Sequence, residues 1–319
     1  MSDIYVRPYD SGGRGSNKGL LVAVLLAFVV GGGIWWGLSH RAEKEPEPDV
    51  VKTTESAQKA PETMPEKKPA KSTKPAAVQP DVNRAFIKAQ ALIRSGKLAE
   101  GSTLLEDVIS TTTDAKLKDN ALRVQGRANM DLFLSDAPTD EKKSYVIQPG
   151  DYLDRIAKQN KTTVDLIRKI NKIEGDTIYP GARLLVPVAP FVIEVDKSTR
   201  TMDLVINGTR LKRYSVGLGR HGKTPLGTFK TVVHQTNPDW SPPSGGIVPF
   251  GDPLNVLGTR WISFLDATRP ELKGFGIHGT ADRTSIGGDT SNGCIRMLNE
   301  DVEEVFLLIP RGTQVVISE

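Results

Sequence analysis

The sequence predicts a multidomain protein with one membrane-spanning helix, a short α-helical region, a small βααβ module and a mostly β C-terminal domain. Three patterns carry this prediction. Residues 20–38 hold no charged side chain, apolar residues recur at helical spacing over residues 81–134, and strand-like alternation begins at Phe191. At 319 residues the chain is long enough for two or three compact units joined by linkers.

The charge of the chain is modest. Charged residues make up 25% of it and the formal net charge is +4, so no domain is strongly basic. Proteins that bind nucleic acid concentrate lysine and arginine in one patch or stripe, and we therefore expect no nucleic-acid partner. Attraction to an acidic polymer remains compatible with this balance.

The N-terminal part is predicted to anchor the protein in a membrane. Residues 1–18 would be a cytoplasmic tail and residues 19–38 a transmembrane helix, which a tryptophan pair closes as an aromatic belt. Three basic residues precede the span and favour an N-terminus inside the cell. A cleaved signal peptide is the alternative, although residues 37–40 form a poor cleavage site. We expect a single-pass protein of the inner membrane, with its C-terminal domain in the periplasm or cell wall space.

Two segments follow the span. Residues 39–80 mix Lys, Glu, Pro, Ala and Thr with few large apolar residues, which predicts a disordered linker. Residues 81–136 carry apolar residues at helical spacing, interrupted at Gly96. The segment SGKLAE at 95–100 resembles a tetratricopeptide-like (TPR-like) helical hairpin, of which one copy is visible. An isolated repeat is marginally stable, so we expect it to pack on a neighbour or a protein partner; a helical spacer without a partner is the alternative.

Residues 144–188 form a distinct small module. A strand and turn (YVIQPGD, 145–151) precede two short helices, the second ending in IRKIN (167–171), and IYPGARLLVP (178–187) turns into a last strand. These segments resemble the LysM module. The resemblance implies binding to glycans that contain N-acetylglucosamine, with the turn after Gly150 and the loop before the last strand lining the groove.

Residues 189–319 are predicted to form the mostly β domain. Asn207-Gly208 is a typical hairpin turn between strand-like segments, and the meander continues to residue 234. Near the end of the chain, Asn299 is expected to cap one helix, which Pro310 terminates. Residues 313–317 would be a closing strand.

Cys294 is the only cysteine of the chain. A single thiol closes no intramolecular disulfide, and with the one nearby histidine it cannot complete a tetrahedral metal site, so we expect no metal. It is therefore either a buried apolar residue or a nucleophile. The second interpretation needs a base, for which His278 is the candidate, and Arg296 would lie on the same face of an extended segment, placed to hold a carboxylate. Gly293 lacks a Cβ, so its N–H and that of Cys294 could turn together toward an oxyanion.

The complete pattern favours the nucleophile. GIHGT at 276–280, a polar glycine-rich loop and SNGCIRM at 291–297 resemble the signature of the L,D-transpeptidase catalytic domain, the YkuD-type fold, a β-sandwich with a short helix. The resemblance implies that Cys294 attacks a peptidoglycan stem tetrapeptide, that D-alanine leaves, and that an amine of another stem peptide completes a 3-3 cross-link. The partners would be stem peptides and glycan strands, and no cofactor is needed.

The resemblance also implies roles for neighbouring residues. The carbonyl of Gly279 would orient the imidazole, Ser291 would support the loop, and Trp240 lies in a segment that edges the substrate cleft. Asn292 stands where the family often has histidine. Three alternatives remain open: an L,D-carboxypeptidase with water as acceptor, an envelope-protein anchoring enzyme, and a membrane-tethered peptidoglycan-binding scaffold whose catalytic fold is vestigial.

Residues 217–224, GLGRHGKT, match the phosphate-loop pattern. That loop holds phosphates only where a helix follows it, and here a strand-like segment, TFKTVV at 228–233, follows. We therefore reject nucleotide binding. The segment resembles instead the turn between two core strands of the same family.

Overall fold

The computed structural model describes residues 80–319 of the chain. Three helices come first: α1 (Pro80–Arg94), α2 (Leu98–Thr111) and α3 (Ala115–Leu134). The predicted tail, transmembrane helix and linker lie outside the described residues, apart from residue 80. Within residues 80–319, no helix is both long and apolar enough to cross a membrane. The likeness of α1 to α3 to a TPR hairpin stays a prediction.

The sequence explains where these helices begin and end. Gly96, which follows α1, has φ +84°, a conformation that glycine adopts without strain. Asp114 caps α3 because its side chain accepts hydrogen bonds from two backbone N–H groups of the first turn. The helices share a small apolar core formed by Ala89, Leu105, Val108, Ile109, Leu117, Ala121 and Leu122.

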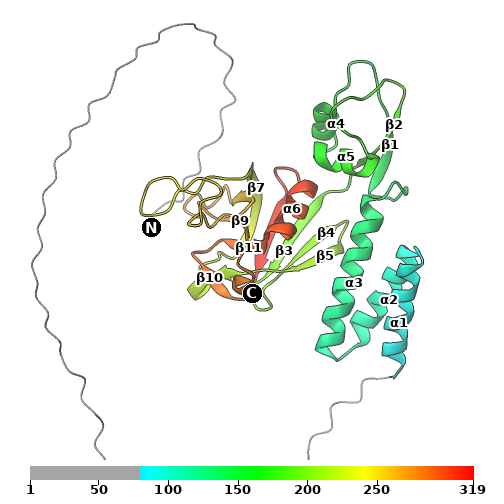
Figure 1. Ribbon diagram of the computed structural model, residues 1–319, viewed down its shortest axis with the longest axis horizontal. Helices are drawn as coiled ribbons and strands as arrows, with labels where there is room; N and C mark the ends of the chain where they lie inside the picture. The colour runs from blue at the N-terminus through cyan, green and yellow to red at the C-terminus, as the bar shows by residue number, and fades with distance from the viewer. Residues whose placement is uncertain (1–79) are drawn as a thin grey trace, which may run out of the picture. The chain divides into compact units, whose positions relative to one another are not determined.

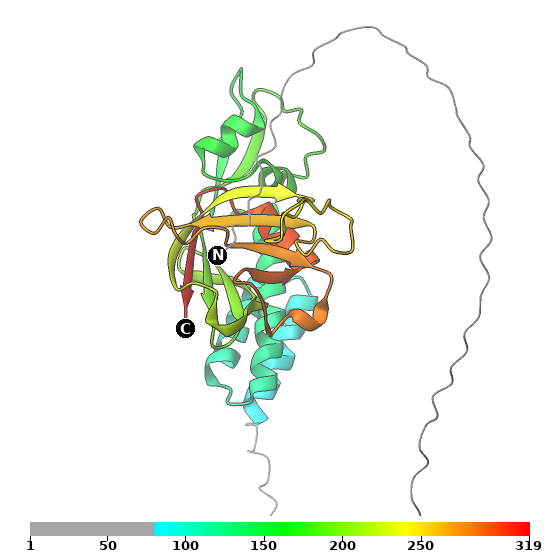
Figure 2. The ribbon, with the colours of Figure 1, turned by 90° about the vertical axis from the view of Figure 1, so that its left-hand side faces the viewer.

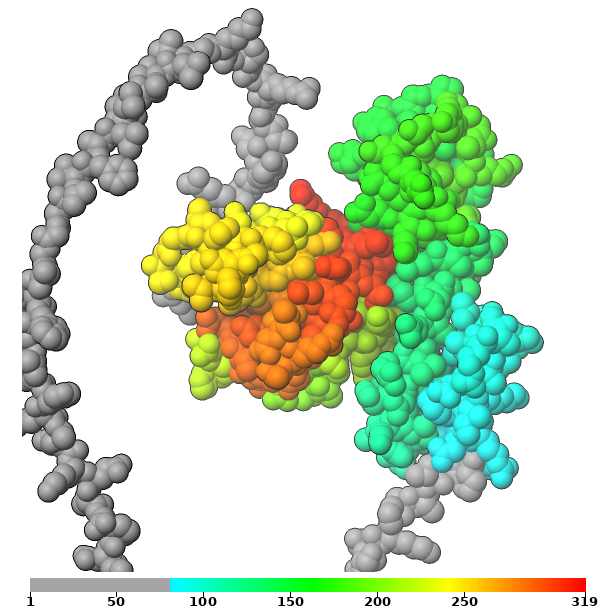
Figure 3. Space-filling model, in the orientation of Figure 1, coloured from blue at the N-terminus to red at the C-terminus, as the bar shows by residue number. Residues whose placement is uncertain are grey.

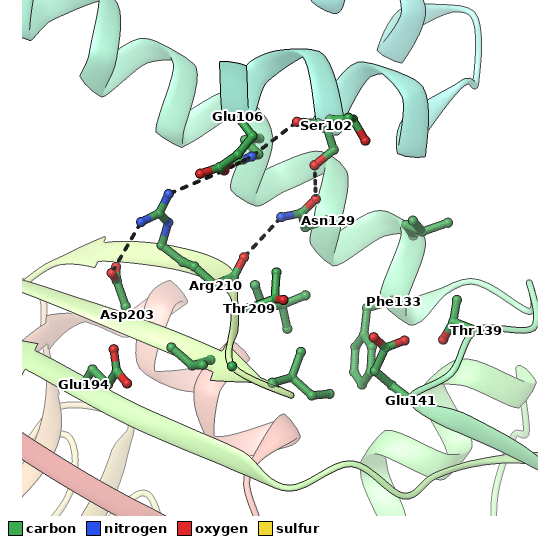
Figure 4. Close-up of a pocket in the computed structure, with 17 residues that line it drawn as sticks. Ser102, Glu106, Asn129, Phe133, Thr139, Glu141, Glu194, Asp203, Thr209 and Arg210 are labelled. Atoms are coloured by element: carbon green, nitrogen blue, oxygen red, sulfur yellow. Dashed lines mark hydrogen bonds and ion pairs between the residues drawn. The ribbon is translucent and has the colours of Figure 1, made fainter. Parts of the chain in front are cut away.

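Helix α3 packs against β5 (Thr209–Ser215), the edge strand of the large sheet. A Cβ on Gly126 would lie 3.0 Å from Cγ of Lys212, so the glycine permits this close approach. Asn129 Nδ2 donates to the carbonyl of Arg210 at 3.3 Å, and the guanidinium of Arg210 lies 3.9 Å from Glu106 and 3.8 Å from Asp203 (Figure 4). The helical region therefore covers an edge that would otherwise be open to pairing. Binding of a further protein through this region stays a prediction.

The LysM-like module has the predicted βααβ order. Strands β1 (Lys142–Val146) and β2 (Arg183–Pro187) pair in antiparallel fashion around α4 (Leu153–Gln159) and α5 (Val164–Asn171). Thr163, the N-cap of α5, accepts from the Leu166 N–H and donates to the carbonyl of Leu307 at 2.6 Å. Leu166 belongs to the same apolar core as Phe133 of α3 and Phe191 of the large sheet.

The C-terminal domain is built on one eight-stranded sheet with the order β11-β9-β8-β7-β12-β3-β4-β5. Besides β5, its strands are β3 (Phe191–Asp196), β4 (Thr201–Ile206), β7 (Gly227–Thr236), β8 (Arg260–Leu265), β9 (Gly276–Thr280), β11 (Ile295–Leu298) and β12 (Gln314–Ser318). Figure 2 shows β7, β8, β9 and β11 one after another across the domain. A separate parallel pair joins β6 (Leu218–Gly219) and β10 (Asp289–Ser291), and two short 3-10 turns, η1 (Arg220–Gly222) and η2 (Arg283–Ser285), complete the elements.

The mostly β prediction is confirmed, and one continuous hydrogen-bonded sheet forms the body of the domain. Strand β12 pairs with both β7 and β3, so its hydrogen bonds join the two halves of the domain into one sheet. The Asn207-Gly208 turn has φ +50° and +74°, as a type I′ hairpin turn requires. The expected cap at Asn299 is wrong: it is the first residue of α6 (Asn299–Leu308), and its Oδ1 accepts the N–H of Thr259 instead.

Candidate active site

The proposed catalytic residues lie on two neighbouring strands. Strands β9 and β11 run parallel and side by side (Figure 1), with Ile277 opposite Ile295 and His278 opposite Arg296. The two isoleucines are fully buried in the core that α6 covers. Because side chains alternate along a strand, His278 and Arg296 face the other side of the sheet. There Cys294 packs in a separate small cluster with Leu257 and Trp261.

His278 is held as a neutral base. Its side chain is 2% exposed, and Nδ1 lies 2.8 Å from the carbonyl oxygen of Gly279. A carbonyl can only accept, so Nδ1 carries the hydrogen and Nε2 keeps its lone pair. Burial lowers the pKa of His278 to about 4, with a smaller lowering from the Arg296 cation and an opposing effect of the hydrogen bond to Gly279. The imidazole is therefore uncharged at neutral pH.

Cys294 is held as a thiol. The residue is 6% exposed, and its Sγ lies 3.8 Å from the carbonyl of Gly274, to which the thiol donates. Burial raises the pKa of Cys294 to about 11, and a hydrogen bond from the backbone of Gly276 and the Arg296 charge offset part of that rise. The resting pair is thus thiol and imidazole, and an ion pair is disfavoured.

The turn before Cys294 needs its glycine. Gly293 has φ +130°, and a Cβ there would lie 2.5 Å from Cε1 of Phe275. Ser291 Oγ donates to the carbonyl of Cys294 at 2.6 Å and accepts the N–H of Gly293 at 3.1 Å. The expected oxyanion site of two N–H groups therefore differs in this structure. The Gly293 N–H is already engaged by Ser291, which leaves the N–H of Cys294 as the remaining candidate of that pair.

The other predicted site residues differ in their contacts and in their exposure. Arg296 donates from Nη1 to Thr290 Oγ1 at 3.1 Å, while its buried Nε has no hydrogen-bond partner among residues 80–319. Trp240 packs on the cluster that contains Cys294, and its buried Nε1 likewise has no partner in the part of the chain that the structure describes. Asn292 is exposed.

Residues 237–258, which include Trp240, form a lobe at the surface (yellow in Figure 3). The lobe exposes two large apolar residues, Ile247 by 65% and Leu254 by 70%.

Two residues at this site were not singled out from the sequence. Trp261 of β8 pairs with His278 of β9, and their ring centroids lie 6.1 Å apart. Thr224 is 1% exposed; its Oγ1 donates to the Gly293 carbonyl at 3.0 Å and accepts the Gly219 N–H at 2.8 Å. Thr224 thereby ties the rejected phosphate-loop segment to the cysteine turn. That segment has only η1 before strand β7, so no helix N-terminus is present there to hold a phosphate.

Within residues 81–319, no group of three or more His, Cys, Asp or Glu side chains is arranged to hold a metal ion. The available chemistry is that of one thiol, one imidazole, one guanidinium and backbone dipoles. These groups suit attack on a carbonyl.

Comparison with known proteins identifies two families along the chain. The YkuD family model, described as the L,D-transpeptidase catalytic domain, matches residues 190–317, and the LysM domain model matches residues 145–187. "Putative L,D-transpeptidase YqjB" of Bacillus subtilis is 38% identical over 143 residues, which cover 44% of this chain and 78% of the relative. "Putative L,D-transpeptidase YkuD" of Bacillus licheniformis is 32% identical over 182 residues, covering 54% and 98%. The NMR structure of the catalytic domain from an E. faecium L,D-transpeptidase aligns at 22% identity, covering 40% of this chain and 96% of that one, with a TM-score of 0.33.

The segment that matches the YkuD family model, residues 190–317, contains the β domain together with His278 and Cys294. The chain belongs to the L,D-transpeptidase family. It is a peptidoglycan L,D-transpeptidase that carries a LysM domain ahead of its catalytic domain.

Proposed function

We propose that Cys294 is the nucleophile of a two-step acyl transfer that forms 3-3 cross-links between stem peptides. The observation that carries this proposal is the Nδ1 hydrogen bond of His278 to the Gly279 carbonyl, which leaves Nε2 free to take a proton on the face that Cys294 shares.

In the first step, the thiol proton passes to His278 Nε2 as sulfur bonds to the carbonyl carbon that precedes the terminal D-alanine. The Cys294 N–H is the backbone donor proposed for the oxyanion. The C–N bond then breaks, and D-alanine leaves with the proton from His278. In the second step, an amine of a neighbouring stem peptide attacks the thioester. His278 takes the proton of that amine and returns one to the sulfur, so the pair is regenerated.

The test is incubation of the full-length protein with a purified tetrapeptide muropeptide. We expect a cross-linked dimer and free D-alanine, with an acyl adduct on Cys294 seen by mass spectrometry. Cys294→Ala should lower turnover at least about a thousandfold. A Cys294→Ala protein that still forms dimers would exclude the proposal. Tripeptide without dimer would assign the chain to L,D-carboxypeptidases, and transfer to an added protein amine would identify an anchoring enzyme. Binding of the muropeptide without any product would support the remaining alternative, a peptidoglycan-binding scaffold.

Arg296 is the proposed ligand of a substrate carboxylate. Its unpartnered Nε and its electrostatic effect on both His278 and Cys294 support this role. Replacing Arg296 with Ala should raise KM about tenfold, with a smaller effect on kcat. Arg123, an exposed arginine of α3, is the matched control, and Arg123→Ala should leave both constants unchanged. An equal loss in both variants would contradict the assignment.

We further propose that residues 19–38 anchor the protein in the inner membrane and that the catalytic domain acts outside it. The uncharged apolar segment and the basic residues before it support this topology. Protease added to spheroplasts should digest the catalytic domain and leave the N-terminal tail protected. Recovery of the whole chain in the cytosol would contradict it.

A further inference from the structure

A cleft distant in sequence from the cysteine motif lies between the LysM domain and the catalytic domain. Its volume is about 1150 Å³. The LysM side consists of the end of α4 and the turn at residues 160–163, and the catalytic side consists of part of β7 and residues 309–314. Both domains act on the same polymer, so a strand bound by one can pass through this cleft to the other.

The charge of the cleft is strongly asymmetric. Four cations line it: Lys158, Lys161, Lys230 and Arg311. The single carboxylate in the lining, Asp154, already pairs with Lys158 at 2.7 Å. Lys161, Lys230 and Arg311 are exposed and have no ion pair with any residue that the structure describes. Three cations without an ion pair among the described residues, in a lining whose one carboxylate is already paired, favour an anion between them.

The wall of the cleft also holds polar groups without partners. Thr162 is 8% exposed, and its Oγ1 makes no hydrogen bond with the described part of the chain. The Nε2 of His234, also in this wall, is buried and unpartnered. Such atoms cost free energy when they are left unsatisfied, and a polar ligand that enters the cleft can offset that cost.

We propose that this cleft is a second peptidoglycan-binding site, in which Lys161, Lys230 and Arg311 hold carboxylates of the stem peptides on the strand whose glycan the LysM domain binds. The proposal rests on peptidoglycan as the polymer of this enzyme but not on the role of Cys294. Carboxylates recur along such a strand wherever a stem peptide is attached, so one strand can engage several of the cations at once. The strand is then held by both domains while the reacting stem peptide enters the active site.

The test is co-sedimentation of the full-length protein, in mild detergent, with insoluble peptidoglycan at low and at raised salt. The cleft variant combines Lys161→Glu, Lys230→Glu and Arg311→Glu. The control variant combines Lys88→Glu, Lys116→Glu and Lys118→Glu, which are exposed lysines of the helical region, and it changes the net charge equally. At low salt the cleft variant should bind about tenfold more weakly than the unmodified protein, with a flatter salt dependence, while the control binds normally. Normal binding by the cleft variant, or an equal loss in both variants, would overturn the proposal.

Two further measurements separate the outcomes. Turnover of a soluble tetrapeptide should be unchanged in the cleft variant, which shows that it is folded, and Cys294→Ala should sediment normally even if it is inactive. A failure of the acyl-transfer proposal is thus distinguishable from a failure of this one. If the cleft variant loses turnover, the milder combination of Lys161→Gln, Lys230→Gln and Arg311→Gln replaces it, with the same weaker binding expected.

The source of the anion is settled by two treated polymers. Stripping phosphate-bearing polymers from the wall should leave the difference between the unmodified protein and the cleft variant intact. Removing stem peptides with an amidase should abolish that difference. The opposite pattern would assign the cleft to a phosphate polymer and would overturn the carboxylate assignment.

Discussion

Burial raises the pKa of Cys294 and lowers the pKa of His278, and each shift favours the uncharged form of its side chain. With the thiol at about 11 and the imidazole at about 4, the uncharged pair dominates across the whole interval between those values. Arg296 lowers both pKa values, so it favours the thiolate but opposes the imidazolium.

The neutral pair predicts how the free enzyme reacts with a small alkylating reagent. Below the pKa of the thiol, the thiolate fraction rises about tenfold per pH unit, and the rate of Cys294 alkylation by iodoacetamide should rise with it. The measurement is the pseudo-first-order rate from about pH 6 to 10, with Cys294→Ala as the blank. A rate that is already constant around neutral pH would indicate a preformed thiolate and would contradict this description.

At the scale of single elements, strand β9 can approach β8 closely because position 276 has no side chain. A Cβ on Gly276 would lie 2.6 Å from Cη2 of Trp261 and 2.7 Å from the carbonyl of Ile262. Gly276→Ala should therefore displace Trp261 from His278, destabilise the protein by about 1–3 kcal/mol and lower kcat. Thermal unfolding and turnover measure the two effects. Gly288→Ala is the control, since the nearest atom to its Cβ would be 3.6 Å away, and it should change neither quantity.

The turn at residues 217–224 supports the cysteine turn through one hydroxyl group. Thr224→Val would leave the buried N–H of Gly219 and carbonyl of Gly293 without this partner. We expect a loss of about 1–3 kcal/mol in the free energy of unfolding, together with slower acylation, because Gly293 directly precedes Cys294, the proposed nucleophile. Thr228→Val, at an exposed position of β7, is the matched control and should change neither quantity measurably. Slower acylation in the control as well would remove the special role of Thr224.

These elements show why the sequence predicted part of the site. His278, Gly293, Cys294 and Arg296 stand in two short motifs, and alternation along an extended segment places Cys294 and Arg296 on one face. The register between β9 and β11 then sets His278 opposite Arg296. Trp261 could not be predicted as a site residue, because its position beside His278 depends on the register between β8 and β9, which no local sequence pattern determines. The engaged N–H of Gly293 depends on one serine rotamer. The pairing of β12 with both β7 and β3 also joins segments that lie far apart in the sequence, so local patterns did not predict the single sheet.

At the scale of the whole molecule, the largest apolar cluster contains residues from all three parts into which the sequence divides the described residues. Phe133 of α3 and Phe191 of β3 meet edge to face, with ring centroids 5.7 Å apart, and Leu166 and Ile170 of the LysM domain join the same cluster. Core packing of this kind couples the stability of the parts. A buried group in any of them therefore influences the unfolding of the whole.

His234, on β7, illustrates this coupling through pH. Burial, with a smaller contribution from the Arg311 cation, lowers the pKa of His234 to about 4 from an ordinary value of 6.5. Between those values the unfolded chain binds a proton at His234 that the folded chain does not. The free energy of unfolding therefore falls as the pH falls from about 6.5 to about 4, and above that window His234 contributes no pH dependence. His278 acts in the same direction over the same window.

Replacing His234 with Phe should therefore make the folded protein less sensitive to acid. The slope of unfolding free energy against pH, measured by denaturant titration within that window, should become shallower by up to about 1.4 kcal/mol per pH unit, the value of one proton. His221→Phe, at an exposed position, is the control and should keep the original slope. If the slope of His234→Phe also stays unchanged while its stability at neutral pH is retained, His234 is not held neutral by burial, and its unpartnered Nε2 must be in contact with water.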